Sequence, residues 1–280
     1  MHGFPKISYG WQPDVADFRD HVWNAQEDAR EQLRTDSAVD LRDEGLDLLH
    51  YELNGVHATC AVSLLAMLDW QCRKRNGKPL RASASFLHQL TKRVEGYRGN
   101  GVSLRGSFRA LKQFGSPPEE LWPSDEVHFA SQPISPELYG FAHKFRAYRY
   151  VRLDRWADTA PGHVVAMRQW LANGNPLALG FAVPHAMESC QQHVVPFDPI
   201  RGSTSGGAAC VVMGFNDELK LPIAVAHRKI SPHARKYGAF LIKTCWGKAW
   251  GQAGYGWLPY AYIESRFAQD VWGFAHPDWQ

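Results

Sequence analysis

The chain lacks any apolar run approaching the roughly 20 residues that a helix needs to span a bilayer. Its N-terminus lacks the basic stretch followed by an apolar core that marks a secretory signal. The formal net charge is only +3 over 280 residues, so the charge balance does not favour nucleic acid or a membrane surface as a partner. These absences predict a cytoplasmic protein.

Cysteines and metal motifs are also scarce. The cysteines are odd in number and form no Cys-x-x-Cys pair, which argues against a disulfide framework and a structural zinc site. No His-x-x-x-His, Glu-x-x-His or Asp-rich loop suggests a metal, and the glycines match no phosphate-binding fingerprint. We therefore expect no cofactor. The five cysteines are Cys60, Cys72, Cys190, Cys210 and Cys245.

What is present is a globular composition, with 45% apolar and 21% charged residues. Apolar residues at helical spacing predict helices early in the chain, and period-two patterns predict strands later, which indicates an α+β fold. Residues 116–162 read as a loop-dominated crossover. The predicted helices cover 60–75 (capped by Thr59 and ended by Gly77), from 83 or 85 to 94, 103–115 and 163–173. The predicted strands are Leu177–Val183, Ala209–Phe215, Ile223–Ala226, Phe240–Lys243 and Gly256–Leu258.

The most informative stretch is 240–255, Phe-Leu-Ile-Lys-Thr-Cys-Trp-Gly-Lys-Ala-Trp-Gly-Gln-Ala-Gly-Tyr. It resembles the strand-and-turn signature of papain-like cysteine peptidases, in which an Asn precedes Ser-Trp-Gly-x-x-Trp-Gly-x-x-Gly-Tyr. Thr244 stands where that family keeps the Asn that orients its catalytic His. Trp246 matches the Trp that shields the Asn–His contact, and we expect it to pack near Thr244.

A second match precedes the first predicted helix, where the chain reads Asn54-Gly-Val-His-Ala-Thr-Cys60. The family pattern is Gln-Gly-x-x-Gly-Ser-Cys, so the resemblance aligns Cys60 with the nucleophile. The positive end of a helix can lower the pKa of a thiol there. Asn54 replaces the Gln that donates to the oxyanion.

Two further stretches extend the resemblance over most of residues 38–263. Ala38–Arg42 resembles the start of mature papain-like domains, and 101–123 resembles bacterial members of the family. Residues 1–37, which are polar and sparsely apolar, are interpreted as an N-terminal arm. The resemblance implies a papain-like domain over 38–280. Within the domain it implies a helical left lobe over about 38–125, an antiparallel, barrel-like right lobe over about 126–280, and a cleft between them. The arm is shorter than the inhibitory pro-segment of many papain-like zymogens.

The catalytic base is missing from the matching strand. The family reads Gly-Gly-His-Ala there, whereas this chain reads Gly206-Gly207-Ala208-Ala. A methyl group cannot exchange a proton with the thiol or the leaving amine, and general acid–base catalysis typically contributes about 10²–10⁴-fold. His57, His185 and His193 are the candidates for a substitute base, although each also reads as an ordinary loop histidine.

These observations leave three functions open. The first, which we favour, is an inactive papain-like pseudopeptidase that binds a peptide or partner protein in its cleft, with Gly206, Gly207, Trp246 and the three histidines near the ligand. The second is an active peptidase or acyl-transferase that uses Cys60 with a non-standard base. The third is a structural or interaction subunit whose cleft is plugged, for example by the N-terminal arm. The sequence does not define the oligomeric state.

Overall fold

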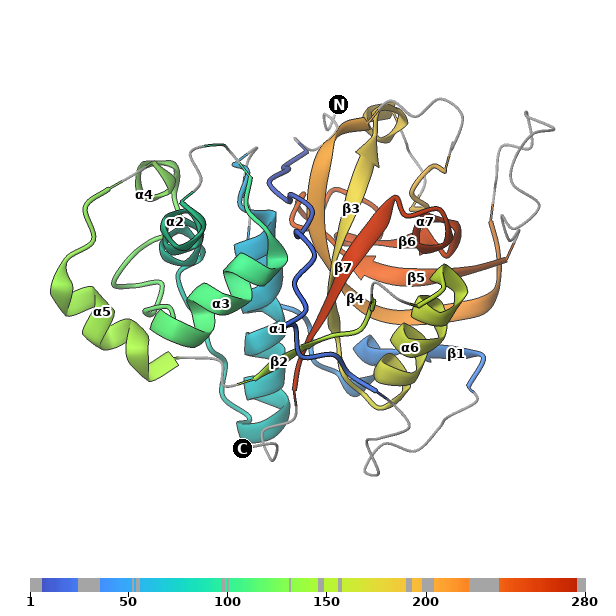
Figure 1. Cartoon of the computed structure of the whole chain (residues 1–280), viewed down its shortest axis with the longest axis horizontal. Helices are drawn as coiled ribbons and strands as arrows, with labels where there is room; N and C mark the ends of the chain where they lie inside the picture. Colours follow the sequence, from blue (N-terminus) through green and yellow to red (C-terminus); the bar gives the residue numbers. More distant parts are fainter. Residues whose placement is uncertain are drawn as a thin grey trace.

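A computed structural model gives the fold of the chain (Figure 1). The structure describes residues 7–24, 36–51, 53, 56–96, 99, 101–130, 132–145, 149–155, 158–189, 193–197, 204–221 and 237–275. The predicted strand Ile223–Ala226 and the candidate oxyanion donor Asn54 lie outside these residues.

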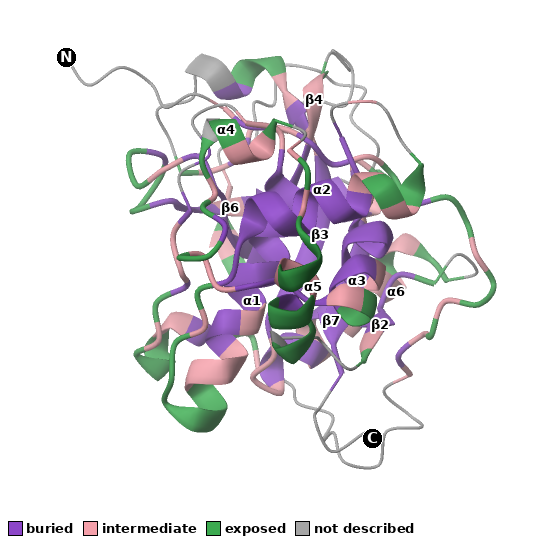
Figure 2. Ribbon diagram, turned by 90° about the vertical axis from the view of Figure 1, so that its left-hand side faces the viewer, coloured by how far each residue is buried: buried purple, intermediate pink, exposed green. Residues whose placement is uncertain are grey.

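One side of the molecule is built from helices around a long central helix, α1 (Thr59–Asn76). Figure 2 shows that much of this helix is buried. The helix ends at Gly77, whose φ of 66° suits glycine, as predicted. Thr59 does not cap the helix: Ala58 occupies the N-cap position, and the Thr59 hydroxyl instead accepts a hydrogen bond from the Ala209 amide in the sheet.

The next two helices begin where the sequence predicts. Helix α2 (Ala84–Glu95) is capped by Ser83, and helix α3 (Leu104–Phe114) is capped by Ser103; each serine hydroxyl accepts a hydrogen bond from a first-turn amide. Both helices pack against each other and against α1. They form the helical wall seen beside α1 in Figure 1.

The segment predicted as a loop-dominated crossover contains short regular elements. These are α4 (Glu126–Phe129), α5 (Pro136–Ala142), a 3-10 turn η2 (His143–Phe145) and strand β2 (Tyr150–Arg152). Each is too short to give a periodic pattern of apolar residues, which is why the sequence does not reveal it.

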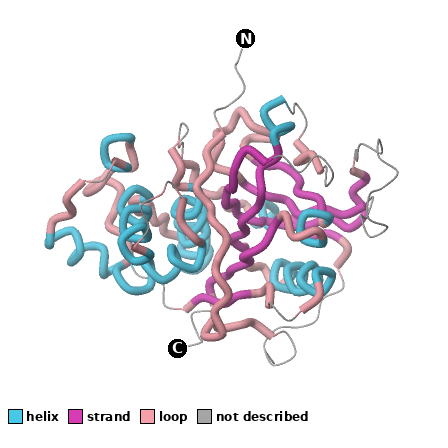
Figure 3. The backbone as a smooth tube through the Cα atoms, turned by 45° about the horizontal axis from the view of Figure 1, so that its top comes forward, coloured by secondary structure: helices cyan, strands magenta, loops and turns pink. Residues whose placement is uncertain are grey.

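The other side is a seven-stranded antiparallel sheet in the order β2-β7-β3-β4-β5-β6, with β1 paired to β4. Figure 3 shows most of the helices on one side of the molecule and the strands, together with the remaining helices, on the other, which confirms the α+β class. The remaining elements are β1 (Ala38–Asp40), η1 (Leu41–Glu44), α6 (Ala160–Ala172), β3 (Leu177–Pro184), η3 (His185–Ser189), β4 (Thr204–Lys220), β5 (Tyr237–Lys243), β6 (Tyr255–Pro259), α7 (Ala261–Glu264) and β7 (Ala268–Phe274).

The sheet contains three strands that the sequence does not predict, β1, β2 and β7, and β5 begins at Tyr237 and not at Phe240. Strand β4 extends beyond both predicted ends of Ala209–Phe215. Strand β7 is absent from the prediction because Gln269 and Asp270 interrupt its apolar pattern, and Asp270 has a φ of 60°, which is unusual for a residue other than glycine.

Helix α6 begins before the predicted start at His163, because Thr159 caps it.

Candidate functional site

Cys60 is the second residue of α1, at the helix end where the sequence places the aligned nucleophile. Its side chain is fully buried, with 0% exposure. The Sγ–H group donates to the backbone carbonyl of Val102 at 3.3 Å, and it lies 3.8 Å from the carbonyl oxygen of Gly10. The thiol is therefore covered by a residue from the N-terminal part of the chain.

The covering residues form an extended segment, Ile7–Asp14, which we call the cleft segment. In Figures 1 and 3 this part of the chain runs between the helical side and the sheet side. On the helical side, the Val102 amide donates to the Gly10 carbonyl at 2.8 Å, and the Gln12 amide donates to the Val102 carbonyl at 3.0 Å. The cleft segment thus pairs with the start of the α3 region.

The cleft segment also pairs with the sheet. The amides of Gly10 and Trp11 both donate to the Gly207 carbonyl, at 2.9 and 3.0 Å. Nearby, the Ser8 carbonyl accepts a hydrogen bond from Trp246 Nε1 at 2.8 Å. The cleft segment therefore bridges the two sides, so that the cleft is occupied by the chain itself.

Close contacts with glycines fix how the cleft segment lies. A Cβ atom at Gly180 would come within 2.1 Å of the Trp11 indole, and one at Gly207 within 2.6 Å of the Trp11 backbone oxygen. A Cβ at Gly206 would lie 2.8 Å from the Tyr9 ring. The predicted binding residues Gly206 and Gly207 thus contact a peptide segment, namely the chain's own.

Gly10 itself is constrained twice. Its φ is 120°, and a Cβ atom there would lie 2.1 Å from the His57 carbonyl oxygen. Only glycine has free access to such a backbone conformation. An alanine at this position would therefore displace the cleft segment.

Ala208 lies on β4 at the end of the sheet that meets the N-terminus of α1. The amide of the next residue, Ala209, donates to the Thr59 hydroxyl at 2.9 Å, so the neighbours of Ala208 and Cys60 are in contact. Ala208 is 1% exposed. The position that resembles the family's catalytic His is therefore brought to the thiol end of α1, and it carries a methyl group.

Thr244 follows β5 and is 3% exposed. Its amide donates to the Gly254 carbonyl at 3.1 Å, but its buried hydroxyl oxygen has no hydrogen-bond partner among the described residues. Trp246 is 3% exposed and meets Trp250 edge-to-face, with ring centroids 5.1 Å apart. Trp246 is part of the core of the sheet side.

The rings of His57 and His185 have other hydrogen-bond partners, and His193 makes a backbone hydrogen bond. His57 Nδ1 accepts a hydrogen bond from the Tyr9 amide at 3.3 Å. His185 Nδ1 lies 2.6 Å from the Ser205 hydroxyl, and the His193 carbonyl accepts from the Trp257 amide at 2.6 Å. Within the described residues, the hydrogen bonds of Cys60 go to backbone carbonyls and not to these rings.

Burial raises the pKa of the Cys60 thiol well above its ordinary value, and the carboxylates of Asp14, Glu95 and Asp270 raise it further. The hydrogen bond that the thiol donates to Val102 also favours the protonated form. These effects oppose the positive end of α1, from which the sequence predicts a lowered pKa. While the cleft segment is in place, Cys60 is held as a thiol.

A buried cluster of charges anchors the end of the cleft segment. Its carboxyl groups outnumber its guanidinium groups by four to two, so full ionisation would leave excess negative charge in a desolvated place. The sequence does not reveal it, because its members are far apart in the chain and each resembles an ordinary charged residue. The members are Asp14, Asp20, Asp154, Asp270, Arg105 and Arg152.

Arg152 pairs with all four carboxylates of this cluster, and Asp270 links the cluster to the cleft segment. The Asp270 carboxylate accepts from Trp11 Nε1 at 3.1 Å, from the Asp14 amide at 2.8 Å and from Arg152 Nη2 at 2.8 Å. The Asp14 carboxylate in turn accepts from Trp272 Nε1 at 2.8 Å. The cleft segment is thus tied to β2 and β7 by buried polar contacts.

We expect the cleft segment to be held most firmly at acidic pH. Burial, and after it the charge of the Asp14 carboxylate, raise the pKa of Asp270 to about 7. Departure of the segment would admit water and remove Asp14, which would return this pKa toward about 4. A carboxyl group with a higher pKa in the bound state favours that state at low pH, and the contribution is lost as the pH rises through the bound-state value. Binding should therefore weaken between about pH 4 and pH 7.

The measurement is the alkylation rate of Cys60 between pH 5 and 8, divided by the rate in the Gly10→Ala variant at the same pH. This ratio cancels the ionisation of the thiol. The protection of Cys60 from alkylation should decrease as the pH rises toward 7, and Asp270→Asn should make this protection less dependent on pH. Arg105, Asp20, Asp154, Glu95 and His163 also act on the cluster, so the profile will be broad. Protection that grows with rising pH would contradict the prediction.

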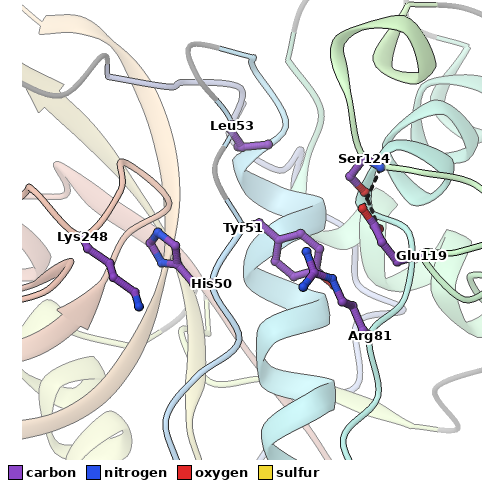
Figure 4. Close-up of a pocket in the computed structure, with 7 residues that line it drawn as sticks. All are labelled: His50, Tyr51, Leu53, Arg81, Glu119, Ser124 and Lys248. Atoms are coloured by element: carbon purple, nitrogen blue, oxygen red, sulfur yellow. Dashed lines mark hydrogen bonds between the residues drawn. The ribbon is translucent and has the colours of Figure 1, made fainter.

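A separate cavity of about 450 Å³ lies beside the chain segment that precedes α1 (Figure 4). In Figure 4, Lys248 and His50 lie on one side of this segment, and Arg81 lies by the Tyr51 ring. The cavity shares no lining residue with the Cys60 site. Its lining residues are His50, Tyr51, Leu53, Arg81, Glu119, Ser124 and Lys248.

The described residues contain neither a candidate metal cluster nor a membrane-spanning helix. No group of three or more His, Cys, Asp or Glu side chains is placed to hold a metal ion there. In the same part of the chain, no helix has the length and apolar character needed to cross a membrane.

The chain is similar in sequence to a curated viral protein. No family model matches the chain. The chain is 23% identical over 209 residues to the uncharacterized peptidase C1-like protein L477 of Acanthamoeba polyphaga mimivirus, a match that covers 72% of this chain and 61% of that protein. The chain therefore matches less than two thirds of the length of this relative.

Solved structures give a stronger likeness in architecture. Xylellain, a cysteine protease from Xylella fastidiosa, superposes with a TM-score of 0.76 at 23% identity, covering 96% of each chain. The digestive procathepsin L2 proteinase from the larval midgut of Tenebrio molitor superposes with a TM-score of 0.70 at 18% identity, covering 96% of this chain and 78% of that one. At this level of identity the likeness establishes the architecture, and the chain has the papain-like fold.

Proposed function

We propose that the protein is a catalytically inactive homologue of the papain-like cysteine peptidases, whose cleft binds a peptide segment without cleaving it. The observation that carries the proposal is the residue beside the thiol end of α1. Ala208 stands there, where the family resemblance places a His. The names of the relatives, a peptidase C1-like protein and two proteases, support descent from enzymes of this class.

The chemistry of a thiol nucleophile explains why this one replacement is decisive. The thiol must lose its proton to attack a carbonyl, and the leaving amine must gain one. Members of such a catalytic unit act together, so the loss of one removes most of the rate. Thr244 in place of the orienting Asn costs little more, since there is no imidazole left to orient.

The occupied cleft supports a resting state in which the ligand is the chain's own cleft segment. The hydrogen bonds of Gly10, Trp11 and Gln12 to both sides of the cleft are those of a bound extended peptide. A peptide or partner protein would enter only when this segment leaves. The same occupancy favours, as a second candidate, an interaction subunit whose cleft stays closed.

A peptidase assay tests the proposal. The purified protein should not hydrolyse generic dipeptidyl fluorogenic substrates between pH 5 and 8, because neither the base nor an ionised thiol is available. Robust hydrolysis that disappears in Cys60→Ala would overturn the proposal, and His57, His185 and His193 would then be tested as the base.

A further inference from the structure

The contacts of the cleft segment define what the cleft can recognise. We propose that the cleft selects extended peptides in which a glycine is followed by a tryptophan, and that a partner protein displaying such a sequence replaces the cleft segment. This inference rests on the proposed function, because it requires a ligand that binds and is not cleaved. The observed occupant, Tyr9-Gly10-Trp11, supplies the pattern.

The glycine requirement comes from the turn before α1. A Cβ atom at the Gly10 position would lie 2.1 Å from the His57 carbonyl oxygen and 2.5 Å from its carbonyl carbon. These are backbone atoms next to the start of α1, so they cannot move aside as the end of a flexible side chain could. The φ of 120° at Gly10 adds a second reason to exclude other residues.

The tryptophan requirement comes from the sheet. The indole lies against the bare backbone of Gly180, where a Cβ would approach a ring atom to 2.1 Å. The indole N–H donates to the Asp270 carboxylate at 3.1 Å, a hydrogen bond between buried groups. Phenylalanine could fill part of this space but would leave the carboxylate without that donor.

The position before the glycine favours a flat ring, although less strictly. The Tyr9 ring contacts the backbone of Gly206, and it lies 5.7 Å from the His57 ring between centroids. The backbone hydrogen bonds to Val102 and Gly207 are available to any extended peptide. They therefore add affinity, whereas the glycine and the indole supply the specificity.

The tethered cleft segment competes with any ligand in trans. A tethered segment acts at an effective concentration on the order of 1 mM, so a free peptide binds the unmodified protein only weakly. Gly10→Ala removes this competitor and alters no other residue of the cleft. The full-length Gly10→Ala variant is therefore the receptor for the test.

The experiment measures fluorescence anisotropy of labelled peptides added to that variant. The peptide Ser-Tyr-Gly-Trp-Gln-Pro-Asp copies residues 8–14. It should bind to the Gly10→Ala variant at least ~10-fold more tightly than to the unmodified protein. Replacing its Gly with Ala should weaken binding ~100-fold or more. Replacing its Trp with Phe should weaken binding ~10-fold or more. Adding Gly180→Ala to the receptor should abolish the preference for Trp.

Equal binding of the three peptides would overturn the inference. It would also be overturned if the Gly-Trp peptide did not bind to a variant in which Cys60 has become reactive. If Gly10→Ala fails to fold, Trp11→Ala is the second receptor, since a segment without its indole should yield to the Gly-Trp peptide. Mass spectrometry of the bound peptide separates the two proposals. Cleavage of the peptide would refute the inactive function while leaving the Gly-Trp preference intact.

Discussion

Gly10→Ala is expected to expose Cys60 and to raise its alkylation rate by iodoacetamide at least ~100-fold. The new Cβ would lie 2.1 Å from the His57 carbonyl oxygen, at a φ of 120° that favours glycine. Strain of roughly 3 kcal/mol on the bound segment corresponds to a hundredfold change in the equilibrium between bound and released segment. Cys60 is fully buried in the bound state, so its reaction rate reports the released population. Mass spectrometry of the Cys60 peptide gives the rate.

Gly77→Ala is the matched control. Gly77 also has a positive φ, at the far end of the same helix, and a Cβ there meets no atom within 4 Å. Its replacement introduces strain without touching the cleft segment, so Cys60 should stay protected. Equal alkylation rates in Gly10→Ala and the unmodified protein would show that the segment does not control access to the thiol.

Trp246→Ala should lower the free energy of unfolding by about 3–5 kcal/mol. The Trp246 ring is buried against Trp250 and Phe181, with centroid distances of 5.1 and 6.0 Å, so its removal leaves a large cavity. The same variant loses the hydrogen bond from the indole to the Ser8 carbonyl, and it should also increase the alkylation of Cys60. Urea denaturation measures the change in stability.

Trp246→Phe separates packing from the hydrogen bond. It keeps a ring in the core but cannot donate to Ser8, so we expect a loss of about 1–2 kcal/mol together with weaker protection of Cys60. A loss below about 1 kcal/mol in Trp246→Ala would show that the turn is not part of the core.

The fold could be predicted from local signals that this chain keeps. Ser83 and Ser103 mark helix starts by their capping chemistry, and Gly77 marks a helix end by its left-handed φ. The turn with Trp246 and Trp250 carries its own spacing, which identifies the papain-like architecture. Strand β7 could not be predicted, because Asp270 interrupts its apolar alternation and binds a distant part of the chain, the cleft segment.

The candidate site could be predicted only in part. The family motifs predict Cys60 as the aligned nucleophile and Ala208 at the position of the family's base, since both lie in local patterns. A cleft plugged by the N-terminal arm is only the third alternative, and the motifs do not single out Gly10 and Trp11, because their pairing with Gly207 joins residues almost 200 positions apart in the chain. The raised pKa of Cys60 likewise depends on burial by this segment and on carboxylates from other elements.

The two replacements that the family resemblance implies agree with each other. Without an imidazole at position 208, an Asn at position 244 would have no ring to orient, and the buried Thr244 hydroxyl lacks a hydrogen-bond partner among the described residues. Adding Ala208→His and Thr244→Asn to the Gly10→Ala variant therefore gives a positive control. The imidazole should stabilise the thiolate and raise the alkylation of Cys60 near pH 6.

The most direct test is whether the Gly10→Ala variant turns over a fluorogenic dipeptidyl substrate. The result distinguishes a protein that has no catalytic activity from a peptidase whose cleft is blocked by its own segment. In this variant the thiol should be accessible, so occlusion can no longer explain a lack of activity. We predict no hydrolysis between pH 5 and 8 even though Cys60 reacts with iodoacetamide. Hydrolysis by Gly10→Ala that is lost in the Gly10→Ala, Cys60→Ala double variant would show that the protein is a self-inhibited peptidase.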